Sequence, residues 1–294
     1  MRATGEPRGT ATEARFRGAD DLRLVGRQLY YEQLNFWLNP VAAIFTVGFS
    51  VVFLILLGAS AGSSHSQTLG GLKVIQYYVP GFIAYGVMAT CFNSLSVSLV
   101  VRRETGLLKR VRLAPLPTWI FLAAIFASTL VICVIQVVVL LVIGKVGYDV
   151  ALPSSWGAFI FALVVGAASF TAIGVAMSTL IPNQEAGGPV VSVIFFVLLF
   201  LSGLWYPISS NSGLAQFASF FPVRHMILAV FAPFDFGGAA SSPWAWHDYL
   251  VMAVWGAAGV FVALRRWSWS PRRADRGRSG AGRFAFRRSG DDAA

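Results

Sequence analysis

Six long apolar stretches are the feature that most limits how this chain can fold. A membrane-spanning helix needs about 20 mostly apolar residues, because the hydrocarbon core of a bilayer is roughly 30 Å thick. Charged residues make up only 12% of the chain, whereas soluble domains carry about 25%. We therefore predict an all-α polytopic membrane protein. Its six transmembrane helices are expected at residues 40–58, 79–101, 117–143, 156–181, 190–204 and 247–264.

The positive charges indicate how these spans are oriented. Of the 23 Lys and Arg residues, only Lys73, Lys145 and Arg224 lie in the first, third and fifth loops. The others lie in the N-terminal arm, the second loop and the C-terminal tail, which the positive-inside rule places in the cytoplasm. Both termini are then cytoplasmic, in agreement with the absence of a signal-peptide pattern at the N-terminus. We expect a disordered basic arm at 1–19, a transmembrane domain at 20–270 and a disordered basic tail at 271–294.

The second loop, "RRETGLLKRVRLAPLP" at residues 102–117, has the pattern of a short amphipathic helix. Leu107, Leu108 and Val111 recur at helical spacing and form one apolar stripe. Pro115 and Pro117 would end the helix before the third span. Two interpretations remain open: the loop lies on the inner leaflet with its arginines on lipid phosphates, or it inserts its stripe into a groove on a soluble partner.

Polar and small residues inside the spans predict contacts within the bundle. Thr90, Asn93, Ser94, Val97 and Ser98 lie close to one face of the second span, which predicts either a substrate path or hydrogen bonds between helices. In the fourth span, small residues at four-residue intervals predict a close packing face. The stretch "NQEAGGP", residues 183–189, is interpreted as a turn between the fourth and fifth spans.

Several chemical functions lack the residues that they need. The chain has no phosphate-binding loop of the G-x-x-x-x-G-K-[ST] type, so ATP hydrolysis is not expected on it. No charged residue lies well inside the first five spans, which argues against proton-coupled transport. Cys91 and Cys133 show no metal-ligand or disulfide spacing and are expected to be buried thiols. We predict no catalytic residue, no metal site, no resident cofactor and no nucleic-acid partner.

The second loop resembles that of ABC-2-type permeases, the membrane subunits of one class of ABC exporter. The family pattern is an acidic residue, any residue, Gly, Leu, a basic residue, and a Thr-Pro or Ala-Pro pair before the third span. Other stretches also resemble the family: "RLVGRQLYYEQLNFWLNP", "LSGLWYPI", "FFPVRHMILAVFAPF" and "ALRRWSWSPRR". The first of these resembles the interfacial connecting helix, although Leu38 stands where Arg is common.

The resemblance implies a permease subunit of the drug-exporter type that moves an apolar or amphiphilic substrate out across the cytoplasmic membrane. It implies two ATPase subunits, which use ATP and Mg, and a second permease copy or a homologue, all surrounded by membrane lipids. The loop would be the coupling helix that rests on the ATPase. Its coupling residues would be Glu104, Gly106, Leu107, Leu108, Lys109, Arg110, Val111 and Arg112.

The resemblance also implies where the substrate would pass. The second and fifth spans of two subunits would face one another, which adds Phe195, Phe196 and Phe200 to the polar face as candidate pathway residues. Short helices between the fifth and sixth spans would re-enter the outer leaflet as an external gate, at Pro207, Pro222 and His225. Two alternatives remain: a permease for lipid-linked glycans, and a membrane scaffold or sensor that transports nothing.

Overall fold

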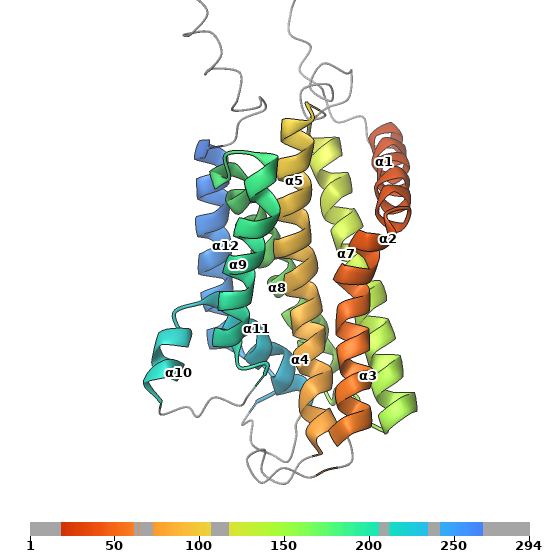
Figure 1. Cartoon of the computed structure of the whole chain (residues 1–294), viewed down its shortest axis with the longest axis vertical. Helices are drawn as coiled ribbons and strands as arrows, with labels where there is room; N and C mark the ends of the chain where they lie inside the picture. The colour runs from red at the N-terminus through yellow and green to blue at the C-terminus, as the bar shows by residue number, and fades with distance from the viewer. Residues whose placement is uncertain are drawn as a thin grey trace, which may run out of the picture.

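A bundle of long helices, running alternately up and down, forms the protein (Figure 1). The computed structural model describes residues 19–61, 64, 73–106, 118–205, 212–234 and 242–266, and within them it contains helices and no β-strand. The all-α prediction is therefore confirmed. The predicted tail, and the predicted arm apart from Ala19, lie outside the described residues.

The helices follow the apolar stretches of the sequence closely. Three segments are built from consecutive pieces, in which a π-helical element (η) interrupts or ends the α-helix. The elements are α1 Ala19–Trp37, α2 Pro40–Ala43, η1 Ile44–Gly48, α3 Phe49–Ala61, α4 Val74–Met88, η3 Ala89–Ser94, α5 Leu95–Glu104, α7 Thr118–Val142, η4 Ile143–Gly147, α8 Trp156–Leu180, α9 Gln184–Ser202, α10 Gly213–Ala218, α11 Pro222–Phe231, the 3-10 turn η5 Ala232–Phe234, and α12 Trp246–Arg266.

Five helical segments among the described residues are long and apolar enough to cross a membrane. They correspond to the second through sixth predicted spans. Their bounds are Val74–Glu104, Ala123–Gly147, Trp156–Leu180, Gln184–Ser202 and Trp246–Arg266. The first predicted span is a shorter apolar helix, Ile44–Ser60. A break at Asn39 separates it from α1, which corresponds to the interfacial connecting helix expected before it. Several spans are thus present where the sequence places them, and the count of six stays a prediction.

The segment α4–η3–α5 is the central helix of the bundle. Of its most apolar stretch, 78% is buried inside the chain, against 22% for α12 and 28% for α9. Its residues pack against α3, α7, α8, α9 and α11. Within this segment Thr90 is buried, whereas the other residues of the predicted polar face are only partly buried. Large apolar parts of α9 and α12 face outward.

Small residues bring α8 close to its neighbours, as the sequence predicts. A Cβ added at Gly174 would lie 2.6 Å from the carbonyl oxygen of Cys91 in η3. On the other side, a Cβ at Gly259 of α12 would lie 2.8 Å from the backbone of Ala172. These approaches leave no room for a side chain, so α8 is the helix on which the central segment and α12 are both packed.

The prediction that residues 183–189 form a turn is wrong. The helix α9 already begins at Gln184, and Asn183 caps it by accepting a hydrogen bond from the backbone of Ala186 at 2.9 Å. Glu185 lies in the first turn, where the partial positive charge of the helix N-terminus stabilises a negative side chain. A good N-terminal cap therefore starts the helix ahead of Pro189, which lies inside it.

The two ends of the bundle differ in charge and composition. Basic residues Arg102, Arg103, Arg265 and Arg266 lie in the last turns of α5 and α12, at what we call the arginine end. The short helices α10 and α11 lie toward the opposite end (Figure 1). Short helices are thus present between the fifth and sixth predicted spans, although their position relative to a membrane stays a prediction.

Candidate functional site

The predicted polar residues of the second span lie in a π-helical turn. Thr90, Asn93 and Ser94 all belong to η3, in the middle of the central segment. Such turns widen the helix locally and are frequent at functional sites. All three residues, together with Val97 one turn further along, line a single cavity. Ser98 lines it as well, so the structure brings together the five residues of the polar face that the sequence predicts on this span.

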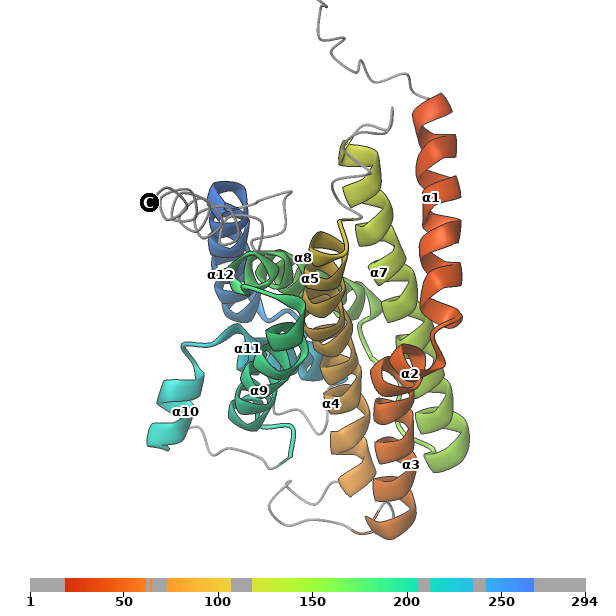
Figure 2. The ribbon, with the colours of Figure 1, turned by 45° about the horizontal axis from the view of Figure 1, so that its top comes forward.

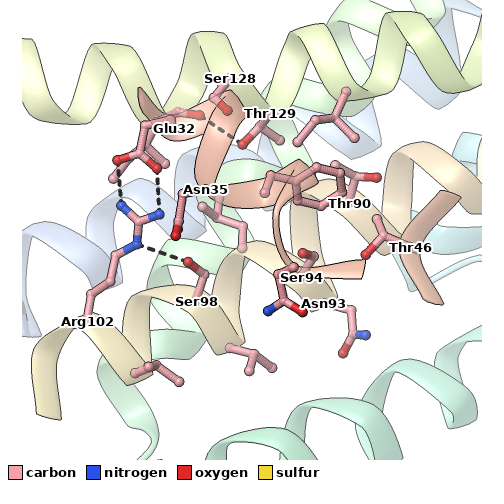
Figure 3. Close-up of a pocket in the computed structure, with 18 of the residues that line it drawn as sticks. Glu32, Asn35, Thr46, Thr90, Asn93, Ser94, Ser98, Arg102, Ser128 and Thr129 are labelled. Atoms are coloured by element: carbon pink, nitrogen blue, oxygen red, sulfur yellow. Dashed lines mark hydrogen bonds and ion pairs between the residues drawn. The ribbon is translucent and has the colours of Figure 1, made fainter. Parts of the chain in front are cut away.

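The cavity has a volume of roughly 680 Å³ and lies between α1, η1, the central segment and α7. Figure 3 shows its polar lining from all of these elements. The labelled residues are Glu32, Asn35, Thr46, Thr90, Asn93, Ser94, Ser98, Arg102, Ser128 and Thr129.

The wall of the cavity combines apolar and polar groups. Phe45, Tyr85 and Ile132 are among its apolar lining residues. Opposite in character, the side-chain oxygen of Asn93 is buried and has no hydrogen-bond partner in the part of the chain that the structure describes. The hydroxyl groups of Ser94 and Ser98 also belong to the lining residues and can form hydrogen bonds. The cavity is thus suited to a molecule with an apolar body and a polar group.

An ion pair lies in the wall of the cavity on the side of the arginine end. Both guanidinium amino groups of Arg102 donate to the carboxylate of Glu32, at 2.7 and 2.6 Å, and its Nε donates to Ser98 at 3.0 Å (Figure 3). The side chains are only 14% and 9% exposed. A bidentate, mostly buried pair of this geometry is among the stronger polar contacts in proteins. It connects α1 to the last turn of α5. This helix leads into the second loop, residues 102–117, which we call the basic loop.

A second contact holds α1 on the bundle. The side-chain amide of Gln33 donates to both the hydroxyl and the carbonyl of Ser128 in α7, each at 2.9 Å. The indole of Trp37 in turn donates to Gln33 at 3.1 Å. Figure 2 shows α1 running alongside α7. Helix α1 is therefore fixed to α5 and α7, which both contribute to the wall of the cavity.

Arg103, the next residue, is anchored in the opposite direction. The residue is 4% exposed, and its guanidinium donates to the carbonyls of Ser178 and Ile181, at 3.0 and 2.6 Å. These carbonyls belong to the C-terminal end of α8, where backbone acceptors lack helical partners and a cation is favoured. The consecutive arginines thus attach the end of α5 to α1 on one side and to α8 on the other.

The start of the basic loop is defined by two of the predicted coupling residues. Glu104 lies 3.4 Å from the guanidinium of Arg103. Gly106 follows with a φ of +73°, a left-handed conformation that glycine adopts at little cost and that ends the helix. The six remaining predicted coupling residues, Leu107 to Arg112, lie outside the described residues.

Residues 26–234 match the sequence profile of the family described as "ABC-2 type transporter". The match covers more than half of the chain, from α1 through η5, and includes the whole cavity. The chain belongs to the ABC-2 type transporter family. A Bacillus subtilis (strain 168) protein named "Putative transport permease YvfS" is 28% identical over 141 residues, which are 48% of this chain and 57% of that protein. The aligned region thus spans little more than half the length of this relative.

Family membership together with the apolar helices makes this a multi-pass membrane protein. The phenylalanines expected along the pathway of this ABC-2 chain do not gather at the cavity. Phe195 packs in the core against Tyr85 and Phe92, with ring centroids 5.7 and 6.1 Å apart. Phe196 and Phe200 lie on the outer face of α9 and are more than half exposed. Their proposed place opposite a second subunit stays a prediction.

The predicted gate residues of this ABC-2 chain lie away from the cavity. Pro222 begins α11, where its missing N–H costs nothing. His225 is buried one turn later, with Nδ1 2.6 Å from a carboxylate oxygen of Asp248 in α12. The third, Pro207, lies outside the described residues. The contact of His225 with Asp248 joins α11 to α12, and gating by Pro222 and His225 stays a prediction.

Sequence reasoning missed the polar residue that joins the first three spans of this ABC-2 protein. Gln136 of α7 is 1% exposed; its amide donates to Ser50 at 2.6 Å and to the carbonyl of Thr46 at 3.2 Å. Its oxygen accepts from Thr90 at 3.3 Å. A polar side chain in the middle of an apolar span was the available signal. The residue connects η1 and α3 with the pathway turn η3.

Proposed function

We propose that this chain is the permease subunit of an ATP-driven exporter, which moves an apolar or amphiphilic molecule out of the cell with the help of an ATPase on a separate chain. The proposal rests on one observation. The start of the basic loop is fixed, through consecutive arginines, to two helices on opposite sides of the central segment. One of them, α1, forms a wall of the cavity.

This arrangement would let a push on the loop reach the cavity. A displacement of the loop toward the bundle moves the last turn of α5, and Arg102 carries α1 with it through Glu32. Arg103 transmits the same displacement to the end of α8. Because α5 continues without a break into η3, the pathway residues move as part of the same helix. We propose that ATP-driven closure of the ATPase dimer supplies the push.

The size and chemistry of the cavity support a drug-sized amphiphile as cargo. Pockets for such ligands measure roughly 300–1,000 Å³ and combine apolar walls with a few polar groups. The cavity, at roughly 680 Å³, has that composition, with the hydroxyl-bearing residues Thr90, Ser94 and Ser98 in its lining. A long lipid-linked glycan would need more space than this cavity, lined by described residues, provides.

The assembly would contain two permease chains and two ATPase chains, with the arginine end and both termini in the cytoplasm. The outward-facing apolar surfaces of α9 and α12 support contacts with lipid and with a second permease. Glu104 and Gly106 would lie at the ATPase surface, since they begin the basic loop. No bond chemistry is assigned to them.

The test is to purify the tagged chain from its native membrane and identify a phosphate-loop ATPase that accompanies it. The pair, reconstituted in vesicles, should move a fluorescent amphiphile only when ATP is present. Leu107→Gln combined with Val111→Gln should abolish co-purification of the ATPase while the permease still inserts into the membrane. ATP-independent movement, or a complex that survives this double change, would contradict the proposal.

Glu104→Ala is the second variant, since it leaves the apolar stripe in place. We expect the complex to assemble while transport falls, because the carboxylate beside Arg103 transmits force and is not needed for docking. Unchanged transport would remove Glu104 from the coupling path. The same panel separates a scaffold that binds lipid, which would show neither ATPase nor transport.

A further inference from the structure

Three side chains with metal-binding groups meet at the end of the bundle opposite the arginine end. His225 lies in the first turn of α11, and His247 and Asp248 lie in the first turn of α12. One ligand atom from each lies within 4.8 Å of those of the other two. The cluster is remote from the cavity and takes no part in the proposed coupling path.

The hydrogen bonds of His225 determine which nitrogen is available. Its Nε2 lies 2.7 Å from the backbone carbonyl of Ser219, the residue that ends α10. A carbonyl oxygen only accepts hydrogen bonds, so Nε2 must carry the proton. The other nitrogen, Nδ1, then faces a carboxylate oxygen of Asp248 at 2.6 Å. Two lone pairs cannot stay this close, so either a proton or a metal cation must lie between the side chains.

The orientation of His225 is the one that metal-binding histidines have. Such histidines donate their second ring N–H to a backbone carbonyl or a carboxylate, which fixes both the tautomer and the ring. The ring is buried, with a side-chain exposure of 3%, so it would be a rigid ligand. A proton alone would explain the contact with Asp248, and it would require nothing from His247.

The position of His247 favours a metal ion over a proton between His225 and Asp248. Its Nδ1 lies 4.0 Å from the same oxygen of Asp248, and its ring centroid is 5.5 Å from that of His225. Ligand atoms around a tetrahedral zinc ion, at about 2.0–2.1 Å from it, are separated from each other by about 3.3 Å. The separations here lie on both sides of that value. Because the side chain of His247 is 80% exposed, it can close the remaining gap by rotation.

We propose that His225, His247 and Asp248 form a Zn²⁺ site that joins α11 to the start of α12. Two imidazoles and one carboxylate match the ligands that zinc prefers, and water would complete the coordination from the solvent side of His247. The neighbouring Arg224 carries a positive charge that opposes any cation here, which the Asp248 carboxylate offsets. The site would hold the end of α10, α11 and α12 together. It does not depend on the proposed export function.

The test measures Zn²⁺ binding to the full chain, purified in detergent through a tag without histidines and freed of metal with a chelator. Titration calorimetry should show one Zn²⁺ per chain, and bound Co²⁺ should show the visible absorption of a tetrahedral centre. His247→Ala should weaken Zn²⁺ binding at least tenfold, as should Asp248→Asn. His65→Ala, which removes the remaining histidine, is the matched control and should bind as the unaltered chain does.

Two results would overturn the proposal. If the unaltered chain binds no Zn²⁺, or binds it no better than His225→Gln, the cluster is an ion pair that holds a proton only. If His247→Ala keeps full affinity and stoichiometry, the zinc is bound elsewhere. Because the side chain of His247 is 80% exposed, its replacement by Ala should leave the fold intact, so that a change in Zn²⁺ affinity reports on the site.

Discussion

Replacing Glu32 with Gln tests whether α1 is energetically tied to the end of α5. The substitution keeps the shape of the side chain and removes its charge, so an amide N–H would face the guanidinium of Arg102 in place of an acceptor oxygen. A hydrogen bond to a charged group contributes about 1.5–3 kcal/mol, and removing one partner of a buried pair costs about 3–5 kcal/mol. Arg102 keeps Ser98 and a position 5.9 Å from the ring of Phe121. We therefore expect Glu32→Gln to lower the free energy of unfolding by about 2–3 kcal/mol.

The assay is chemical unfolding of the detergent-purified chain, followed by tryptophan fluorescence, for Glu32→Gln, Arg102→Gln and the double variant. The single changes should not add: the coupling between them should be about 2 kcal/mol, since the two side chains touch. Asp149→Asn is the control, because that carboxylate pairs with Lys145 on the surface and should contribute nothing measurable. Additive losses would refute the reasoning and leave α1 without a strong connection to α5.

Three further substitutions or conditions test the packing and the opposite end of the bundle. Gly174→Ala should lower stability by about 2 kcal/mol, because overpacking typically costs about 1–3 kcal/mol and the added carbon would lie 2.6 Å from the Cys91 carbonyl. Gln136→Leu should lower it by about 1 kcal/mol in the same unfolding assay, since hydrogen bonds between membrane helices contribute roughly 0.6 kcal/mol on average. Burial lowers the pKa of His225, but hydrogen bonds with Asp248 and the Ser219 carbonyl outweigh it and raise the pKa above its ordinary value. In metal-free protein this contribution to stability should be complete below about pH 6.5 and be lost as the pH rises through the raised pKa.

Each of these expectations has its own control. Gly188→Ala in α9 meets no atom within 4 Å and should be neutral or slightly stabilising. Equal losses for Gly174→Ala and Gly188→Ala would mean that α8 is not packed as described. A Gln136→Leu variant as stable as the unaltered chain would show that the polar contacts between the first three spans are dispensable. A pH dependence that persists in His225→Gln would assign it to another group.

Local sequence patterns predicted the helices because each span must satisfy its own backbone. In a membrane, helical hydrogen bonds are made within one segment, so an apolar stretch of sufficient length specifies a helix without knowledge of its neighbours. That is why the expected fourth span, 156–181, agrees with α8 at Trp156–Leu180. The error at residues 183–189 arose where a single capping residue, Asn183, moved a helix start by several residues.

The candidate site was predictable in part, for the same reason. Thr90, Asn93, Ser94 and Val97 share one face of one helix, and that proximity follows from helical spacing. Phe196 and Phe200 share a face of α9 as well, but which side of that helix meets the bundle is decided by packing against other helices. A pattern within a single span cannot say what lies opposite it.

The sequence by itself determined the fold class, the places of the apolar helices and the polar face of the central one, because these depend on contacts between residues a few positions apart. The tertiary structure alone decided that Glu32 meets Arg102, that Arg103 reaches the end of α8, and that His225 meets Asp248. Each of these contacts joins residues far apart in the sequence. Such contacts depend on which helices pack side by side, and small residues such as Gly174 of α8, close to the backbone of Cys91 in the central segment, help to set that packing.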